Sequence, residues 1–218
     1  PEPTFADYGP AVGVFLSQPL ADELTRAQAL RFGALLHDIA RPSSAGVADG
    51  RATSMVQDVD GAVLASAVLG RMRASERLRQ HVAALTEHHR MFEFLVRQAP
   101  LHRREIYRYL HGSEPVQIDV TLLGLADRLA TWSEPSAPAV QSQLGVARQV
   151  VAEALAWSAR PPRPPLRGDE LVRRLGIPPG PELGRILEQL REASFAGEVS
   201  SRDEALELAA RLYRGRAQ

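Results

Sequence analysis

Apolar residues recur at helical spacing along most of the chain. In residues 22–40 the positions that repeat every three or four residues are Leu24, Ala27, Leu30, Ala34 and Leu35, which is the pattern of a helix with one buried face. The same periodicity predicts helices over residues 60–73, 75–90, 101–111, 119–132, 139–159 and 182–195, with shorter ones near 169–176 and after residue 201. No alternating run is long enough to form a strand, so the sequence predicts an all-α fold.

Side chains that cap helices stand at several of the predicted helix ends. Asp22 is expected to cap the first long helix, and Asp119 to cap the helix that begins there. Ser201, with Glu204 three residues further on, has the pattern of a capping box for the last helix. Gly176 is expected to end the short helix before it. Prolines and glycines in the first twenty residues predict an irregular segment followed by a short helix.

Two proline-rich segments divide the predicted helices. They lie at residues 134–138 and 161–165, and the second is a stiff polyproline spacer. We therefore expect a helical-bundle domain over residues 1–135, a connecting helix and linker over 136–165, and a smaller C-terminal helical module over 166–218.

Composition narrows the chemistry that is available. The 218 residues carry 26 basic side chains, all of them arginine, and 26 acidic ones. A net charge of zero gives no overall attraction to nucleic acid, so an RNA-binding surface would have to be a local patch. With no cysteine, a metal ion would be held by histidine and carboxylate alone. No apolar run reaches the roughly 18 residues of a membrane span and no signal peptide is seen, which predicts a cytoplasmic protein without membrane contact.

The most specific chemical signal is the pair His37-Asp38 at the end of an apolar helix. Imidazole and carboxylate both bind divalent cations, and one shared ion would offset the cost of burying them. The alternative is an ordinary helix C-terminus, in which His37 contacts the last carbonyls and Asp38 begins a turn. Residues 41–56, which follow, are expected to form a polar loop, either the lip of a site or a simple connector.

The run from Leu35 to Pro42 (LLHDIARP) resembles the signature of the HD superfamily of metal-dependent phosphohydrolases. Asp127, in the run LLGLADRLAT, resembles the last metal ligand of that family, and His88-His89 resembles its intermediate histidine site. The resemblance implies that His37, Asp38 and Asp127 are catalytic metal ligands. It implies that His88 or His89 joins them, and that the cofactor is a divalent Mn, Ni, Mg or Fe ion.

Two histidines of the family pattern are missing. Residues 1–36 contain no histidine, and Tyr8 stands near the position where the first is expected. A second should precede Gly61-Ala62 by four residues, where this chain has Gln57-Asp58. Because tyrosine and glutamine are poor substitutes for neutral imidazole at a metal, we expect an eroded site that holds its ion weakly or has lost it.

The C-terminal region carries a second resemblance. The segments LRGDEL (166–171), LGIPPGPELGRILE (175–188) and DEAL (203–206) look like the C-terminal module of bacterial tRNA nucleotidyltransferases and poly(A) polymerases. Those proteins carry an HD domain ahead of this module, and RREIYRYL (103–110) resembles their central helix. The resemblance implies a bacterial protein of this kind, with tRNA or another structured RNA as its partner.

Nucleotide transfer in that family belongs to an N-terminal head, which has a Gly-Ser turn and an Asp-x-Asp pair that binds two magnesium ions. The comparable acidic pair here, Asp58-Val59-Asp60, lacks that turn and the flanking strands. We interpret it as the solvated start of a helix. This chain alone is therefore not expected to transfer nucleotides.

Two functions remain as hypotheses. The first is a structural or RNA-interaction module, in which Arg103, Arg104 and Arg108 bind phosphates; an ordinary solvated arginine face is the alternative interpretation. The second is a metal-dependent phosphohydrolase that acts on a phosphorylated small molecule, namely a phosphomonoester, cyclic phosphate or nucleotide. The sequence specifies no oligomeric state.

The remaining histidines and the tryptophans receive structural interpretations. His81 and His102 are expected at the surface or beside helices, and His111 at a helix end. Trp132 and Trp157 are expected to pack helices near the linker.

Overall fold

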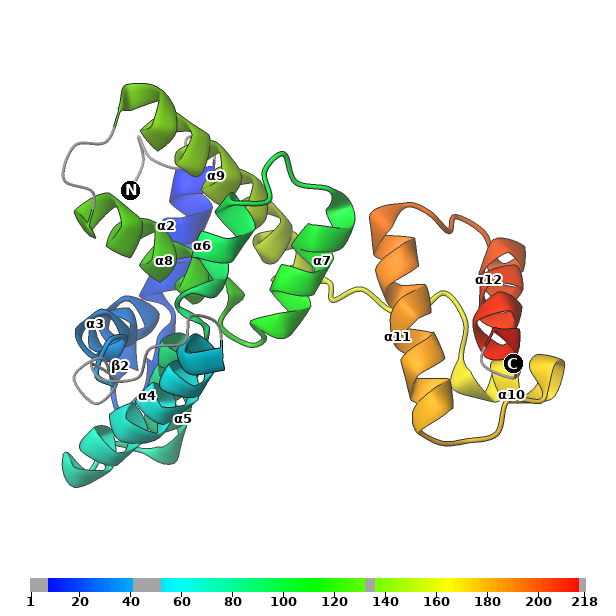
Figure 1. Ribbon diagram of the computed structural model, residues 1–218. Helices are drawn as coiled ribbons and strands as arrows, with labels where there is room; N and C mark the ends of the chain where they lie inside the picture. The colour runs from blue at the N-terminus through cyan, green and yellow to red at the C-terminus, as the bar shows by residue number, and fades with distance from the viewer. Residues whose placement is uncertain (1–7, 41–51, 132–135, 216–218) are drawn as a thin grey trace. The chain divides into compact units, whose positions relative to one another are not determined.

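A computed structural model describes residues 8–40, 52–131 and 136–215, and the all-α fold is confirmed. The helices, drawn in Figure 1, are α2 (Gly9–Ser17), α3 (Arg26–Leu36), α4 (Ala52–Arg71), α5 (Glu76–His88), α6 (Met91–Val96), α7 (Arg103–Gly112), α8 (Gln117–Thr131), α9 (Ala137–Ala159), α10 (Gly168–Leu175), α11 (Pro181–Ala196) and α12 (Arg202–Arg214). A short antiparallel pair, β1 (Pro19–Ala21) and β2 (Leu24–Thr25), precedes α3.

The chain forms two compact units whose boundaries do not follow the proline-rich segments. The first unit contains the described residues up to 99 together with 112–155, and the second contains 100–111 and the residues from 156 onward. Most of α7 therefore groups with the C-terminal helices, although the sequence placed it inside a domain over 1–135. Most of the predicted connecting helix, α9, groups with the first unit.

The first unit is organised around α3, α4, α5 and α8. Helices α4 and α5 run side by side (Figure 1), and α3 packs against α5. A Cβ atom added to Gly33 would lie only 2.6 Å from Cδ1 of Leu85, so glycine is what allows this close approach. One hydrophobic cluster of this unit contains Leu20, Ala29, Leu36, Ala65, Leu69, Leu78 and Val82.

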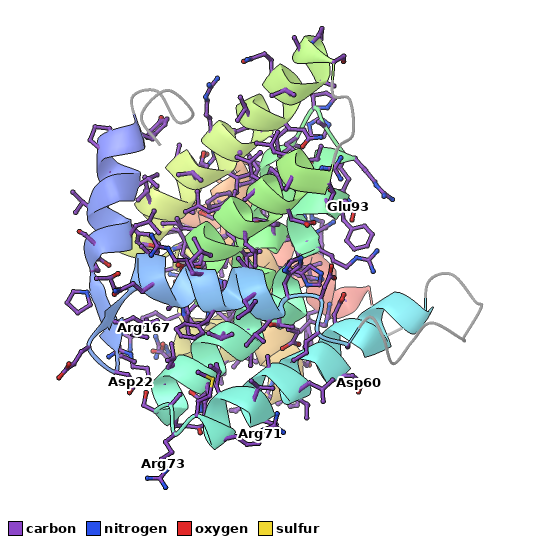
Figure 2. The ribbon with its side chains drawn as sticks, turned by 90° about the vertical axis from the view of Figure 1, so that its left-hand side faces the viewer. Asp22, Asp60, Arg71, Arg73, Glu93 and Arg167 are labelled. Atoms are coloured by element: carbon purple, nitrogen blue, oxygen red, sulfur yellow. The ribbon has the colours of Figure 1, made fainter. Side chains whose placement is uncertain are left out.

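The start of α3 differs from the expected one. Thr25 caps the helix, and Thr25 and Gln28 form a complete capping box. Asp22 instead lies in the tight turn between β1 and β2, where it and Glu23 have positive φ. Its carboxylate accepts a hydrogen bond from the backbone N–H of Ser75 at 2.8 Å. Asp22 therefore ties the hairpin to the start of α5. Figure 2 shows Asp22 at the same end of this unit as Arg71 and Arg73, which lie where α4 ends.

Asp119 is not a cap either, because α8 begins two residues earlier, at Gln117. Its carboxylate is fully buried and accepts a hydrogen bond from Nη1 of Arg26 at 3.0 Å. His81, expected at the surface, is also buried, with Nε2 3.8 Å from Oδ1 of Asp119. These three side chains form an inner cluster that joins α3, α5 and α8.

Other differences concern shorter stretches. Residues 52–56, expected in the loop over 41–56, are the first turns of α4, while the rest of that loop lies outside the described residues. Helix α6 was not expected from the sequence. Trp132 also lies outside the described residues, whereas Trp157 packs against Tyr107 and Phe195 as a helix-packing residue.

The second unit has its own hydrophobic core between α10, α11 and α12. Its buried residues are Leu166, Leu171, Ile177, Ile186, Leu190, Ala193, Val199, Ala205 and Ala209. Gly176 ends α10 in the left-handed conformation, as expected, and Gly197 ends α11 in the same way. Ser201 caps α12 by accepting from the N–H of Glu204, but the Glu204 carboxylate returns to the N–H of Ser200.

Candidate functional site

A polar cavity of about 330 Å³ opens in the first unit. Its walls come from the end of α3, from α4, from the junction of α5 and α6, and from α8. The lining residues are His37, Asp38, Ala40, Asp58, His89, Arg90, Glu93, Gly124, Asp127 and Arg128. Four of the residues predicted as metal ligands, namely His37, Asp38, His89 and Asp127, are therefore brought together.

His37 stands at the C-terminal cap of α3, and its ring is oriented by the helix itself. Nδ1 lies 2.9 Å from the carbonyl oxygen of Ala34. A proton on Nδ1 satisfies that carbonyl and leaves Nε2 with a lone pair. Nε2 is buried without a hydrogen bond to the described residues, 3.4 Å from Oδ2 of Asp38 and 3.5 Å from Oδ1 of Asp127.

His89 is held in the same manner at the end of α5. Its Nδ1 lies 2.6 Å from the carbonyl oxygen of Thr86, and its Nε2 lies 3.8 Å from Oδ1 of Asp38. Burial lowers the pKa of His89, which favours the neutral ring that a cation requires. The neighbouring His88 does not line the cavity. Of the two neighbouring histidines, His89 is therefore the one that lines the cavity.

Asp58 also lines the cavity, although the sequence pattern indicated a solvated helix start. It is half-buried, and burial raises the pKa of its carboxyl group against the opposing influence of His89 and Arg90. One sequence feature marks this position, namely Gly61, which follows Asp58 by nearly one helical turn. In the structure, a Cβ added to Gly61 would be 3.1 Å from Cγ2 of Thr86. That close approach brings α4 against α5 beside the cavity.

The side-chain types of the cavity suit a divalent cation, since neutral imidazole nitrogens and carboxylates bind Mn²⁺, Fe²⁺ and Ni²⁺. Two ligands of one such ion lie about 3 Å apart, because each bond is close to 2.1 Å. The separations of 3.4–3.8 Å are slightly larger. Among the described residues no three of these donors form a closed metal centre as they stand. A small contraction would be needed to hold an ion.

Two arginines contribute positive charge to the same cavity. Arg128 follows Asp127 on α8, and its Nε donates to Oε1 of Gln143 at 3.1 Å. Its Nη1 lies 3.6 Å from a Glu93 carboxylate oxygen. Arg90 follows His89 and lies 5.7 Å from the centre of the Phe94 ring. Each arginine therefore stands next in sequence to one of the histidine or aspartate side chains of the cavity.

The arginines predicted to bind RNA belong to the second unit. Arg103 donates from Nε to the carbonyl oxygen of Phe195 at 2.8 Å, and its guanidinium lies over the Phe195 ring. Arg104 binds Glu198 through two hydrogen bonds of 2.5 Å. Arg108 contacts Glu192 at 2.7 Å. The three guanidinium groups thus fasten α7 to α11 and the turn that follows it.

Comparison with known proteins covers about four fifths of the chain. No protein-family model matches it. It is 32% identical over 178 residues to the A-adding tRNA nucleotidyltransferase of Deinococcus radiodurans, covering 81% of this chain and 40% of that protein. It is also 32% identical over 178 residues to the CC-adding tRNA nucleotidyltransferase of Thermus thermophilus, covering 80% of this chain and 38% of that protein.

The chain thus spans about two fifths of the length of these relatives. None of the described helices has the length and apolar character needed to cross a bilayer. Across roughly four fifths of its residues, the chain is related to the tRNA nucleotidyltransferases.

Proposed function

We propose that this chain is the helical region of a tRNA nucleotidyltransferase-like protein, and that it contacts tRNA. The observation that carries the proposal is the similarity over 178 residues to an A-adding and a CC-adding tRNA nucleotidyltransferase. The matched 40% and 38% of those proteins leaves the rest of their length outside this chain. Nucleotide transfer is therefore expected to need residues that this chain does not contain.

The second unit offers arginines for phosphate contacts. Arg160 and Arg163 are exposed, and neither has a carboxylate partner among the described residues. Arg167 is 87% exposed and pairs with the exposed Asp169 at 3.2 Å. Exposed ion pairs contribute only about 0–1 kcal/mol, so an RNA phosphate can replace the carboxylate at little cost. We place the RNA-contacting surface here, on residues 160–167.

Arg103, Arg104 and Arg108 are weaker candidates for phosphate contacts than the arginines of residues 160–167. Their side chains already bind Phe195, Glu198 and Glu192, so a phosphate would have to compete with those partners. Replacing them would also loosen α7. They are for this reason poor choices for a first test, and Arg160 and Arg163 are better ones.

A gel-shift titration with tRNA at low salt tests the proposal. Arg160→Ala combined with Arg163→Ala is expected to weaken binding several-fold and to flatten its salt dependence, because each lost phosphate contact lowers the slope of log K against log salt by about 0.7–0.9. The matched control is Arg71→Ala with Arg73→Ala, two exposed arginines of the first unit (Figure 2). Equal affinities for the two double variants would move the surface elsewhere, and no binding by the wild-type chain would refute the proposal.

A second function is favoured by the cavity, and specifically by the buried Nε2 of His37, which faces two carboxylates. We propose that the cavity binds a divalent cation and a phosphoester. His37, Asp38, His89 and Asp127 would hold the ion, which when bound supplies electrophilic activation of phosphate and water. Arg90 and Arg128 would orient the phosphoryl oxygens by charge-assisted hydrogen bonds. Burial lowers the pKa of His89, so its imidazole would remain a neutral ligand at neutral pH.

Metal analysis of the purified chain distinguishes a retained metal site from an eroded one. Plasma mass spectrometry of the purified chain, before and after incubation with Mn²⁺ or Ni²⁺, should show near-stoichiometric metal that is lost in Asp38→Ala if the site is retained. A screen of phosphomonoesters and cyclic phosphates would then follow. Metal-free protein under both conditions would indicate a cavity that serves as scaffold only, as the missing histidines suggest.

A further inference from the structure

Asp58 is a cavity residue to which neither the sequence pattern nor the comparisons assign a chemical role. Its carboxylate lines the same 330 Å³ space as His37, Asp38, His89 and Asp127. Among the described side chains it has neither a hydrogen bond nor an ion pair. A half-buried carboxylate without such a partner is costly, because its charge has lost part of its hydration.

The backbone around Asp58 fixes its direction. Val59 is 51% exposed and Asp60 is also exposed, so the helix turns these two residues to solvent and Asp58 toward the cavity. Figure 2 shows Asp60 on α4, outside the bundle. The packing of Gly61 against Thr86 and Ala40 keeps this turn of α4 close to the other walls of the cavity.

We infer that Asp58 is the fifth donor of a divalent-cation site in this cavity, beside His37, Asp38, His89 and Asp127. This inference rests on the proposed cation site. It also defines the chemistry of the site, because two imidazoles and three carboxylates form a harder, oxygen-rich donor set. Such a set favours Mn²⁺, Mg²⁺ or Fe²⁺ over Zn²⁺.

Charge balance supports the same conclusion. Asp38, Asp58, Glu93 and Asp127 bring four carboxylates to the cavity, whereas Arg90 and Arg128 bring two positive charges. The remaining excess of two negative charges matches one divalent cation. A phosphate would be repelled from this cavity unless that cation were present, so cation and phosphoester are expected to bind together.

The test is a Mn²⁺ titration followed by electron paramagnetic resonance, which detects free Mn²⁺ and needs no enzyme assay. Asp58→Asn should weaken Mn²⁺ binding at least tenfold. Asp60→Asn makes the same chemical change two residues away on an exposed side chain and should leave the affinity within about twofold. Circular dichroism confirms that both variants are folded.

A selectivity measurement adds a second readout. Asp58→His places an imidazole at this turn and should shift the preference of the site from Mn²⁺ toward Ni²⁺. If wild type binds Mn²⁺ and Asp38→Asn does not, but Asp58→Asn binds as well as Asp60→Asn, the role of Asp58 is refuted and the cation site stands. If wild type binds neither ion, the cation site itself is refuted, and the role of Asp58 with it.

Discussion

At the residue scale, the two cavity histidines owe their orientation to the helices that they end. Each ring places Nδ1 against the carbonyl oxygen three residues earlier, Ala34 for His37 and Thr86 for His89. The last carbonyls of a helix lack intrahelical partners, so the helix end supplies a fixed acceptor. Both rings consequently turn Nε2 toward the carboxylates.

The inner cluster of Arg26, His81 and Asp119 gives the protein two opposing pH responses. Burial lowers the pKa of His81 from 6.5 to about 4, so between these values the unfolded chain gains a proton that the folded chain does not. This contribution lowers the free energy of unfolding as the pH falls. Burial raises the pKa of Asp119 from 3.8 to about 6, which has the reverse effect over nearly the same range.

Variants of the inner cluster should separate the two responses. His81→Gln removes the destabilising uptake of a proton by the unfolded state, so its free energy of unfolding should fall less than that of wild type between pH 7 and 4.5. Asp119→Asn removes the opposing contribution and should fall more. Urea unfolding at a series of pH values measures both slopes, and profiles parallel to wild type would contradict this description of the cluster.

Individual residues were predictable where a local motif marks them. His37, Asp38, Asp127 and the His88-His89 pair stood out in the sequence, and the structure brings one histidine of that pair into the cavity. Asp58, His81 and Asp119 were misjudged because their burial depends on partners far along the chain. Asp119 and Arg26 are separated by 93 positions, and no local pattern reveals such a contact.

At the scale of the elements, α3, α5 and α8 each join the inner cluster to the cavity. Along the chain, Arg26 precedes His37 by 11 residues, and His81 and Asp119 precede His89 and Asp127 by 8 each. At about 1.5 Å per residue these spacings correspond to roughly 12–16 Å. The inner cluster therefore fixes the relative position of three helices whose far ends carry the cavity residues.

Close packing between α8 and the start of α6 should also fix the position of His89 relative to Asp127. A Cβ at Gly124 would lie 2.8 Å from Cβ of Phe92 and 3.1 Å from the carbonyl oxygen of His89. Gly124→Ala should thus push His89 away from Asp127, lower stability by about 1–3 kcal/mol and weaken cation binding.

The matched control is Gly145→Ala on α9, where nothing lies within 4 Å of the added atom. It should stabilise the chain by about 0.5–1 kcal/mol, because alanine favours the helix. Thermal unfolding compares the two variants. Equal shifts in melting temperature would contradict the tight contact at Gly124.

Most helices could be predicted from periodicity, whereas their ends and the shortest elements could not. The expected starts at Asp22 and Asp119 failed because Thr25 and an earlier first turn of α8 take those roles. The hairpin before α3 is too short to show alternation, and the six residues of α6 are too few for a helical period. The glycine ends at Gly176 and Gly197 carry a local signal, and Gly176 was correctly predicted.

At the scale of the whole molecule, two units are assembled from segments that alternate along the chain. Residues 100–111 leave the first unit, join the C-terminal helices, and are followed by residues that return to the first unit. Proline-rich segments mark stiff stretches of chain, but they do not indicate which unit a helix between them packs into. Arg104, Tyr107 and Arg108 of α7 bind glutamates of the C-terminal helices and the turn after α11, which accounts for this grouping.

We propose that this chain contacts tRNA because it is related to tRNA nucleotidyltransferases. The most direct test is the fluorescence anisotropy of labelled tRNA titrated with the wild-type chain. The titration is repeated at salt concentrations from about 25 to about 200 mM, the range in which phosphate contacts dominate. We expect saturable binding at low salt, with log K falling linearly as log salt rises. Anisotropy that stays at the value of free tRNA at the lowest salt would contradict it.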